Sequence, residues 1–508
     1  MVRNLFSGFS GRVKVGERAT RPFQIDTGVV QGSRLGPTLF NIFFNELISE
    51  IKKRFVGATF SFGQKLPVLA FADDLVLCSN DPVELQNMLD FCSNFAQQNE
   101  FNFNTKKCKI LNLRKKVDAT LKLGAADLEV VDQYKYLGVP LGRGMHASSK
   151  PAPFGAYLER IRKKAISRAA VTRFLGARGD GLRPKTGIKL YLMLVRPILE
   201  YAAPVLVFNK TGMRELEKLQ LRALKTVIGL QRNIKTETVQ VVSGVEPIKT
   251  RFAFLKLKHF FRLLKKPQNS LVRQVLSSIR AQESRPGFVS ECKNLCGAFG
   301  IPFSRVASAD LEQPLGKFGD ELKKELYHTS FQRDLKAIRE SGQASTLASL
   351  FPPNTSYFSY KPLDLMTRVL NGQDRKVRTS FLQNLCGTSF LYTGYRKKCR
   401  FCENEIENLA HYFFECPLIL KERSAFLKKI TRHIKNTNPP LLRIWAENTN
   451  NKIPILFGGN YVAQNGGKCL LFRKSRAKTP HHSDRVAVLT GKYLEHLGAL
   501  AEAMQDCT

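Results

Sequence analysis

Two short apolar runs, separated by a pair of aspartates, give the first third of the chain its clearest hydrophobic pattern. Residues 68–71 and 75–77 are apolar throughout, and Asp73 and Asp74 lie between them. Runs of this length, rich in aliphatic and aromatic side chains, are typical of buried strands. The pattern therefore predicts a β-hairpin with two carboxylates at its tip.

Helical periodicity surrounds this hairpin. Gly36–Pro37 suits the first turn of a helix, and residues 82–103 place apolar positions on one helical face. Residues 101–113 are expected to return as a strand, and the alternation over residues 12–15 predicts another hairpin. The first helix is expected to bury a stripe that recurs every four residues, at Leu39, Phe43, Leu47 and Ile51.

From about residue 145 the pattern becomes mainly helical. Residues 157–168, 213–230 and 251–266 each place apolar side chains on one helical face and Lys or Arg on the others. Such helices suit contact with a nucleic-acid backbone, although a charged face that is simply solvated gives the same pattern. The net charge of the chain favours backbone contact.

The whole chain is strongly basic. Its 508 residues include 80 Lys and Arg against 42 Asp and Glu, a formal net charge of +38. An excess of this size, spread along the chain, predicts a polyanionic partner, with nucleic acid as the default. The 36 phenylalanines and the long apolar segments are not typical of a ribosomal or histone-like binder.

The cysteines and the apolar segments bear on the compartment. Eleven cysteines without a secretory segment at the start predict a reducing, intracellular site, nuclear or cytoplasmic, and not a secreted protein. Residues 190–208 form the longest apolar stretch, but Arg196, Pro197 and Glu200 interrupt it. No membrane partner is therefore expected.

One group of Cys and His residues has the spacing of a zinc site. Cys399 and Cys402 are followed by His411 and Cys416, in the order C-x2-C-x8-H-x4-C. Three thiolates and an imidazole close a tetrahedral Zn²⁺ site, with no open position for catalysis. The alternative is chance spacing, and whether such a zinc is structural or helps to bind RNA stays open at this stage.

The aspartate pair has two interpretations. Adjacent like charges beside apolar strands are unfavourable unless a cation neutralises them, and Mg²⁺ or Mn²⁺ is the usual cation for such a site. Because turns favour aspartate, an ordinary surface turn is the better explanation of the pair when it is taken by itself. The neighbouring segments decide between the two.

Four segments, in order, resemble the reverse transcriptases of LINE-type (non-LTR) retrotransposons. They are GVVQGSRLGPTLFN from Gly28, FADD from Phe71, NTKKCK from Asn104 and YKYLGVP from Tyr134. The cysteine- and histidine-containing segment near the C-terminus is similar to one found in the same family. The resemblance implies RNA-directed DNA polymerase activity by a two-metal mechanism, with an RNA template and a DNA primer or target as partners.

The resemblance also implies roles for individual residues. Asp73 and Asp74 would be catalytic and would bind Mg²⁺ or Mn²⁺, while Leu137 and Gly138 would support the primer. The nucleotide- and template-binding residues would be Gln31, Gly32, Phe71 and Lys107. For Lys107 a solvated lysine in a basic loop is nearly as good an interpretation.

The family also has an aspartate in an earlier strand. Before Gln31 the only acids are Glu17 and Asp26, and neither fits that role. We therefore expect a polymerase truncated before its first catalytic aspartate, whose activity as an enzyme stays uncertain. The alternative is an inactive retrotransposon remnant that binds RNA or DNA through its basic helices and its zinc knuckle.

The expected fold class is α+β, a partial right-hand polymerase palm followed by a mostly helical part and a small zinc knuckle. The expected domains are a palm over 1–142, a basic helical thumb over 143–270, a basic helical connector over 271–385, a CCHC knuckle over 386–420 and a tail with a final helix over 421–508.

Overall fold

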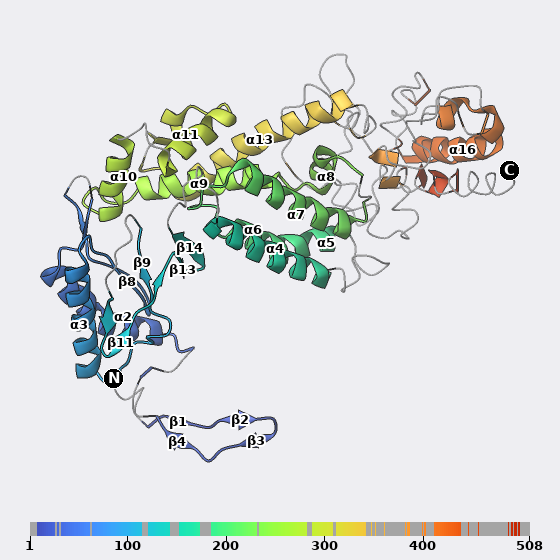
Figure 1. Ribbon diagram of the computed structural model, residues 1–508. Helices are drawn as coiled ribbons and strands as arrows, with labels where there is room; N and C mark the ends of the chain where they lie inside the picture. Colours follow the sequence, from blue (N-terminus) through green and yellow to red (C-terminus); the bar gives the residue numbers. More distant parts are fainter. Residues whose placement is uncertain are drawn as a thin grey trace. The chain divides into compact units, whose positions relative to one another are not determined.

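The computed structural model describes most of the first 437 residues. These are residues 8–25, 28–29, 32–60, 63–113, 120–142, 152–172, 184–230, 233–281, 287–307, 311–341 and 411–437, with isolated positions and short runs between 347 and 497. The chain forms two units (Figure 1). The first comprises Met1–Phe154 and Pro267–Gln282, and the second comprises Gly155–Lys266 and Glu283–Thr508.

The first unit combines helices with small sheets, each of two strands. Its helices are α2 (Gly36–Arg54), α3 (Pro82–Gln98) and α10 (Leu271–Ala281). Its strands are β1 (Ser10–Gly11), β2 (Lys14–Val15), β3 (Arg18–Ala19), β4 (Phe23–Gln24), β5 (Ala58–Thr59), β6 (Lys65–Leu66), β7 (Val68–Phe71), β8 (Asp74–Leu77), β9 (Ile110–Leu111), β10 (Lys122–Leu123), β11 (Ala126–Asp127), β12 (Val130–Val131), β13 (Gln133–Tyr136) and β14 (Val139–Gly142). Among the described residues all pairs are antiparallel except β9–β12. The expected α+β class is therefore confirmed.

The β7–β8 hairpin packs on helices α2 and α3. Leu47, Ile51 and Val68 are buried in one cluster, against which Leu75 and Leu77 also pack. Helix α3 begins where the sequence predicts, because the Asp81 carboxylate accepts the backbone N–H groups of its first turn. The hairpin that carries the aspartates is thus held on a hydrophobic support.

The base of the hairpin depends on one glycine. Gly57 has a φ of 73°, and a Cβ there would lie 2.2 Å from the Cα of Pro67, the residue before β7. The carboxylate of Glu84, on α3, accepts the N–H of Gly57 at 3.0 Å and that of Val56 at 2.8 Å. Any side chain at position 57 would push the hairpin off this anchor.

Two expectations for this unit were wrong in detail. Helix α2 buries Phe44 with Leu47 and Ile51, whereas Phe43 is exposed. The strand expected over 101–113 is reduced to the two residues of β9, because residues 105–107 form a turn.

The second unit is helical in its described residues. Its helical segments are α4 (Ala152–Thr172, from Gly155 onward), α5 (Pro184–Leu190), η2 (Tyr191–Val195), α6 (Arg196–Glu200), α7 (Lys210–Ile228), α8 (Thr236–Ser243), α9 (Ile248–Leu264), α11 (Phe288–Ala298), α12 (Phe303–Ala307), α13 (Leu315–Ser341), η6 (His411–Glu415), η7 (Pro417–Ile419) and α16 (Leu420–Thr437). None of the described helices has the length and apolar character needed to cross a bilayer.

A buried polar network joins these helices. The segment η2 is a π-helical turn, closed by the N–H of Arg196 bonding to the carbonyl of Tyr191. Arg196 forms a buried ion pair with Glu246, to which the Tyr327 hydroxyl also donates. The Tyr191 hydroxyl donates to Gln220 at 2.7 Å, whose amide donates to the carbonyl of Glu246 at 2.8 Å. One charged pair therefore ties η2, α6, α7 and α13 together.

Glu217 of α7 makes this unit sensitive to pH. Removal from water raises the pKa of Glu217 to about 7, although the N–H of Ile248 and the amide of Gln240 donate to its carboxylate. Because the folded state then binds a proton more tightly than the unfolded state, stability falls as pH rises from about 4.5 to about 7.

We expect Glu217→Gln to remove this dependence. The free energy of opening α8 and α9, measured by hydrogen exchange at several pH values, should fall by roughly 2 kcal/mol over this range in the parent chain relative to the variant. Burial also raises the pKa of Asp334 to about 6, so a smaller fall in stability with rising pH remains in both proteins. An unchanged slope in the variant would contradict the assignment to Glu217.

Candidate functional site

The tip of the β7–β8 hairpin carries the two predicted carboxylates. Phe71 and Asp74 are paired across the strands, so Ala72 and Asp73 form a two-residue turn. Ala72 has a φ of 50°, in the left-handed region that favours glycine, which is a strained conformation for alanine. Asp73 and Asp74 are both exposed.

Alternation along the hairpin separates its two faces. Leu75 and Leu77 point toward the helices, whereas Phe71 and Asp74 share the opposite face with Leu69. Leu69 and Phe71 are exposed there. The predicted template-binding Phe71 therefore lies on the same face as one of the predicted metal ligands.

Strand β13 connects the hairpin tip with the predicted basic turn. Burial raises the pKa of Tyr136, and the charges of Asp74 and Cys78 raise it further, so the phenol lies within electrostatic range of the β7–β8 hairpin. The hydroxyl of Tyr134, two residues earlier on the same strand face, donates to the carbonyl of Lys107 at 3.2 Å. Strand β13 thus contacts the backbone of the turn that carries Lys107 and lies within electrostatic range of Asp74.

The predicted primer-supporting residues form the turn after this strand. Leu137 and Gly138 connect β13 to β14 with φ values of 46° and 83°. A two-residue turn with both φ values positive matches the twist of the hairpin it joins. Strand β13 therefore leads into the Leu137–Gly138 turn and binds the backbone of Lys107, through Tyr134, which the sequence analysis did not single out.

The remaining predicted binding residues precede α2. Gly32 is exposed with a φ of 89°, and Ser33 accepts the N–H of Gly36 at 2.8 Å at the start of that helix. A glycine is required at a φ of this sign because other residues are strained there. Gln31 lies outside the described residues.

The aspartate pair suits a hard divalent cation. Two exposed carboxylates on a well-supported hairpin offer the oxygen ligands that Mg²⁺ prefers, and water and substrate phosphates usually complete such sites.

The four predicted zinc ligands come together. Their ligand atoms all lie within 4.8 Å of one another. The Sγ atoms of Cys399 and Cys416 are 3.9 Å apart, and Sγ of Cys402 lies 3.3 Å from Nε2 of His411. A tetrahedral zinc with Zn–S of about 2.3 Å and Zn–N of about 2.0 Å requires roughly 3.8 Å and 3.5 Å for these separations. The donor set therefore fits Zn²⁺.

The surroundings of the cluster orient its ligands. Nδ1 of His411 lies 3.7 Å from the Glu415 carboxylate, leaving Nε2 toward the thiols. The N–H of Phe401 donates to Sγ of Cys399 at 3.4 Å, and Arg423 of α16 donates to the carbonyl of Cys416 at 2.8 Å. The cluster is thus fixed to the beginning of α16.

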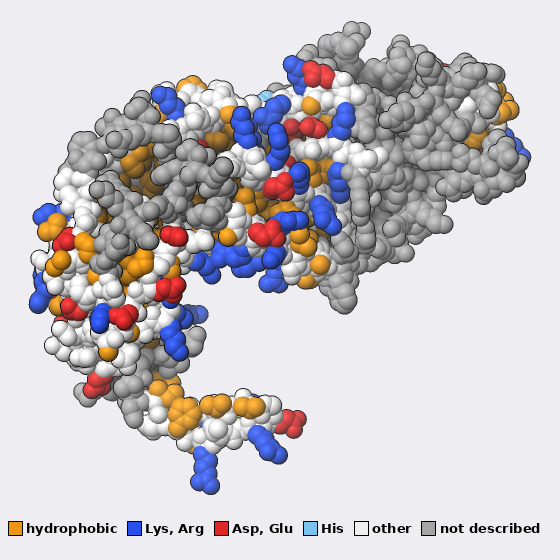
Figure 2. All heavy atoms as spheres, viewed as in Figure 1, with side chains coloured by type: hydrophobic (Ala, Val, Ile, Leu, Met, Phe, Trp, Pro, Cys, Tyr) orange, Lys and Arg blue, Asp and Glu red, His pale blue; other side chains and the backbone are white. Residues whose placement is uncertain are grey.

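Basic side chains follow one face of α7. Lys210, Arg214, Lys218 and Arg222 are exposed and recur every four residues, about 6 Å apart along the helix axis. Figure 2 shows Lys and Arg side chains in blue over much of the visible helical part. We call these four residues the α7 basic stripe.

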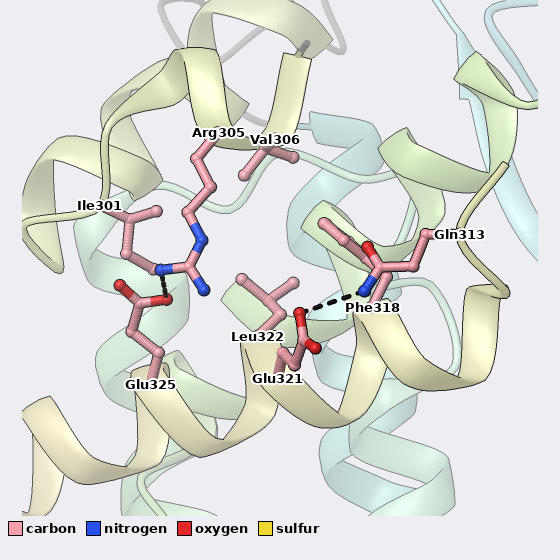
Figure 3. Close-up of a pocket in the computed structure, with 8 residues that line it drawn as sticks. All are labelled: Ile301, Arg305, Val306, Gln313, Phe318, Glu321, Leu322 and Glu325. Carbon is pink, nitrogen blue, oxygen red and sulfur yellow. Dashed lines mark hydrogen bonds and ion pairs between the residues drawn. The ribbon is translucent and has the colours of Figure 1, made fainter. Parts of the chain in front are cut away.

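A pocket lies between α12 and α13, and none of the residues described above lines it (Figure 3). It has a volume of about 180 Å³, and its polar groups bind one another: Arg305 pairs with Glu325, and Gln313 donates to Glu321. Most sites for small molecules are larger than roughly 300 Å³. We therefore assign it no ligand.

Comparison with known proteins identifies the sequence around the hairpin. Residues 2–141 match the family described as reverse transcriptase (RNA-dependent DNA polymerase). The chain is 26% identical over 269 residues to the RNA-directed DNA polymerase from mobile element jockey of Drosophila funebris, covering 51% of this chain and 28% of that protein.

Two further relatives also come from mobile elements. A Pol polyprotein from the type-1 retrotransposable element R2 of Popillia japonica is 34% identical over 96 residues, 19% of this chain and 16% of the relative. A probable RNA-directed DNA polymerase from transposon BS of Drosophila melanogaster is 25% identical over 226 residues, which cover 42% of this chain and 24% of the relative.

The chain spans about a quarter of the length of its jockey and BS relatives. The family match covers the β7–β8 hairpin, the Asn104–Lys107 turn and the β13–β14 turn, and the last two are joined by the hydrogen bond from Tyr134 to the carbonyl of Lys107. Residues 2–141 therefore match the reverse transcriptase family, and the chain is similar to the RNA-directed DNA polymerases of non-LTR (LINE-type) retrotransposons.

Proposed function

We propose that the first unit is a polymerase palm that takes part in RNA-templated DNA synthesis. The observation that supports this proposal is strand β13, where Tyr134 binds the backbone of Lys107, Tyr136 lies within electrostatic range of Asp74 and the Leu137–Gly138 turn follows. A carboxylate, a lysine and a hairpin turn at one edge are the groups that nucleotidyl transfer needs for cation, phosphate and primer.

Each group has a defined task in this proposal. Asp73 and Asp74 hold Mg²⁺ or Mn²⁺, which when bound lowers the charge on the reacting phosphates and activates the primer hydroxyl. Lys107, exposed on its turn, neutralises phosphate. Phe71 and the Gly32 turn line the nucleotide and template, and Leu137–Gly138 supports the primer end. Tyr134 and Tyr136 keep these segments in register.

Primer extension tests the proposal. The full chain, an RNA template with an annealed DNA primer, Mg²⁺ and deoxynucleotides are combined, and Asp73→Ala is compared with Asp127→Ala. Asp127 is the matched control, because it is an exposed aspartate on the β10–β11 hairpin of the same unit. We expect Asp73→Ala to lower the rate at least about 100-fold and Asp127→Ala to leave it unchanged, since a lost metal ligand removes several kcal/mol of stabilisation.

Equal rates for Asp73→Ala and the parent chain would overturn the assignment. Incorporation by neither form, with nucleic-acid binding intact, supports a second candidate, a non-catalytic nucleic-acid binder. The α7 basic stripe favours this candidate, because four cations at regular spacing suit a phosphate backbone whether or not the hairpin is active.

We also propose that Cys399, Cys402, His411 and Cys416 hold Zn²⁺. The interatomic distances and the carboxylate beside His411 support this assignment. With four protein ligands the ion has no open position, so its role is to fix the chain around the start of α16 and not to catalyse a reaction.

A further inference from the structure

A long β-ribbon near the N-terminus has two unlike faces. Strands β1 and β4 form its base, and β2 and β3 form its tip (Figure 1). Figure 2 shows a row of hydrophobic side chains along one side of this ribbon and basic side chains projecting from the other. We call residues 9–25 the N-terminal ribbon.

Its register places the apolar side chains on one face. Gly11 pairs with Phe23, whereas Lys14 pairs with Ala19, so the return strand contains one extra residue between these pairs. This bulge brings Phe23 onto the same face as Val13 and Val15. Phe9 and Ile25 lie there as well, since the N–H of Ile25 donates to the carbonyl of Phe9.

Phe23 is the centre of this face. A Cβ at Gly11 would lie 3.0 Å from Cζ of Phe23 and 3.1 Å from Cδ1 of Ile25, so the aromatic ring lies across the glycine backbone. Phe23 is nevertheless 49% exposed. The ring thus has one side supported by the opposite strand and another open to solvent, the arrangement of a stacking platform.

The charge of the ribbon indicates what covers this platform. Between Phe9 and Ile25 there is one carboxylate, Glu17, against four cations, Arg12, Lys14, Arg18 and Arg21. A second copy of the chain would bring equal positive charges together, and five side chains on a 17-residue ribbon offer far less than the roughly 800 Å² per partner of a stable interface. A polyanion with flat apolar groups fits both the charge and the exposed ring.

We propose that the N-terminal ribbon binds single-stranded nucleic acid, with a base stacked on Phe23 and phosphates paired with the flanking cations. The inference takes its class of ligand from the proposed function but does not require catalysis. Stacking reads neither sequence nor the 2′-hydroxyl, so RNA and DNA strands are expected to bind alike.

Tryptophan fluorescence tests this site directly, because the chain contains a single tryptophan, Trp445. In the full chain with Trp445→Phe, Phe23→Trp provides the reporter, and Phe60→Trp provides the control. Phe60 is a similarly exposed phenylalanine beside β5 in the same unit. The probes are 12-nucleotide oligo(U) and oligo(dT) in magnesium-free buffer, so that failure of the polymerase proposal does not affect the result.

We expect both probes to quench the emission of Phe23→Trp and not that of Phe60→Trp. In the parent background, Phe23→Ala is expected to reduce crosslinking of 5-iodouridine RNA to residues 9–25 about tenfold or more. Gly11→Val, which keeps every charge and aromatic group but occupies the space under the ring, should reduce it as well.

Binding of either probe by anisotropy, without quenching at position 23 and without crosslinks in the ribbon, would overturn the inference. A chain that is dimeric in solution and becomes monomeric with Phe23→Ala would also overturn it, in favour of a second copy of the chain.

Discussion

Removing zinc is expected to release the beginning of helix α16 from the rest of its fold. The thiol of Cys416 directly precedes η7 and α16, and Arg423 of α16 binds the carbonyl of Cys416. Binding of a structural zinc contributes roughly 10–16 kcal/mol at neutral pH, and this energy holds the ligands in place. Without the ion, three thiols and an imidazole within 4.8 Å of one another have little reason to stay together.

The measurement is elemental analysis combined with hydrogen exchange. The purified chain should contain one zinc per molecule, and 1,10-phenanthroline or Cys416→Ala should remove it and increase amide exchange in residues 411–437. Cys292→Ala is the matched control, because Cys292 is equally buried but lies on α11, outside the cluster. A chain that lacks zinc and still protects these amides would disprove the assignment.

Arg196→Met is expected to destabilise the helical second unit by about 3–5 kcal/mol. Arg196 and Glu246 are 9% and 5% exposed, so the substitution leaves a carboxylate out of water without its cation. The Tyr327 hydroxyl still donates to Glu246 but carries no charge to offset it. Hydrogen exchange of the amides of α6 and α9 reports the loss.

Two comparisons isolate the cause. Lys218→Met removes an exposed ion pair with Glu215, 2.8 Å long, and is expected to cost less than about 1 kcal/mol. Arg196→Met combined with Glu246→Leu removes both buried charges and should recover most of the loss. If Arg196→Met costs no more than Lys218→Met, the buried pair does not support the unit in the way described.

Local patterns were sufficient to predict much of the site. The apolar runs on either side of Asp73 and Asp74 specify the β7–β8 hairpin, and the spacing of four Cys and His residues anticipates a cluster whose atoms do converge. In both cases the residues that act together are close in the sequence, so a short window contains the whole signal.

The wrong or incomplete predictions concern residues whose burial or partner depends on segments far away in the sequence. Four-residue steps rotate about 40° around a helix each time, so Phe43 falls at the edge of the face that Leu47 and Ile51 bury, and Phe44 takes the buried position. Arg196 was interpreted only as an interruption of an apolar run, because its partner Glu246 lies 50 residues later.

Tyr134 and Tyr136 were missed because nothing beside them in the sequence identifies their contacts. Their alternation within QYKY was the available signal, but the carbonyl of Lys107 and the charge of Asp74 come from other elements. Tertiary packing, and not local pattern, selects such residues.

The alternation of β13 has a consequence for how this region tolerates insertions. Deleting Lys135, or adding one residue between Tyr134 and Tyr136, would turn one tyrosine to the opposite face of the strand while leaving the other in place. A one-residue change in length there would therefore separate the two tyrosines that now share a face. Length variation in natural relatives should therefore be confined to the loops outside this four-residue strand.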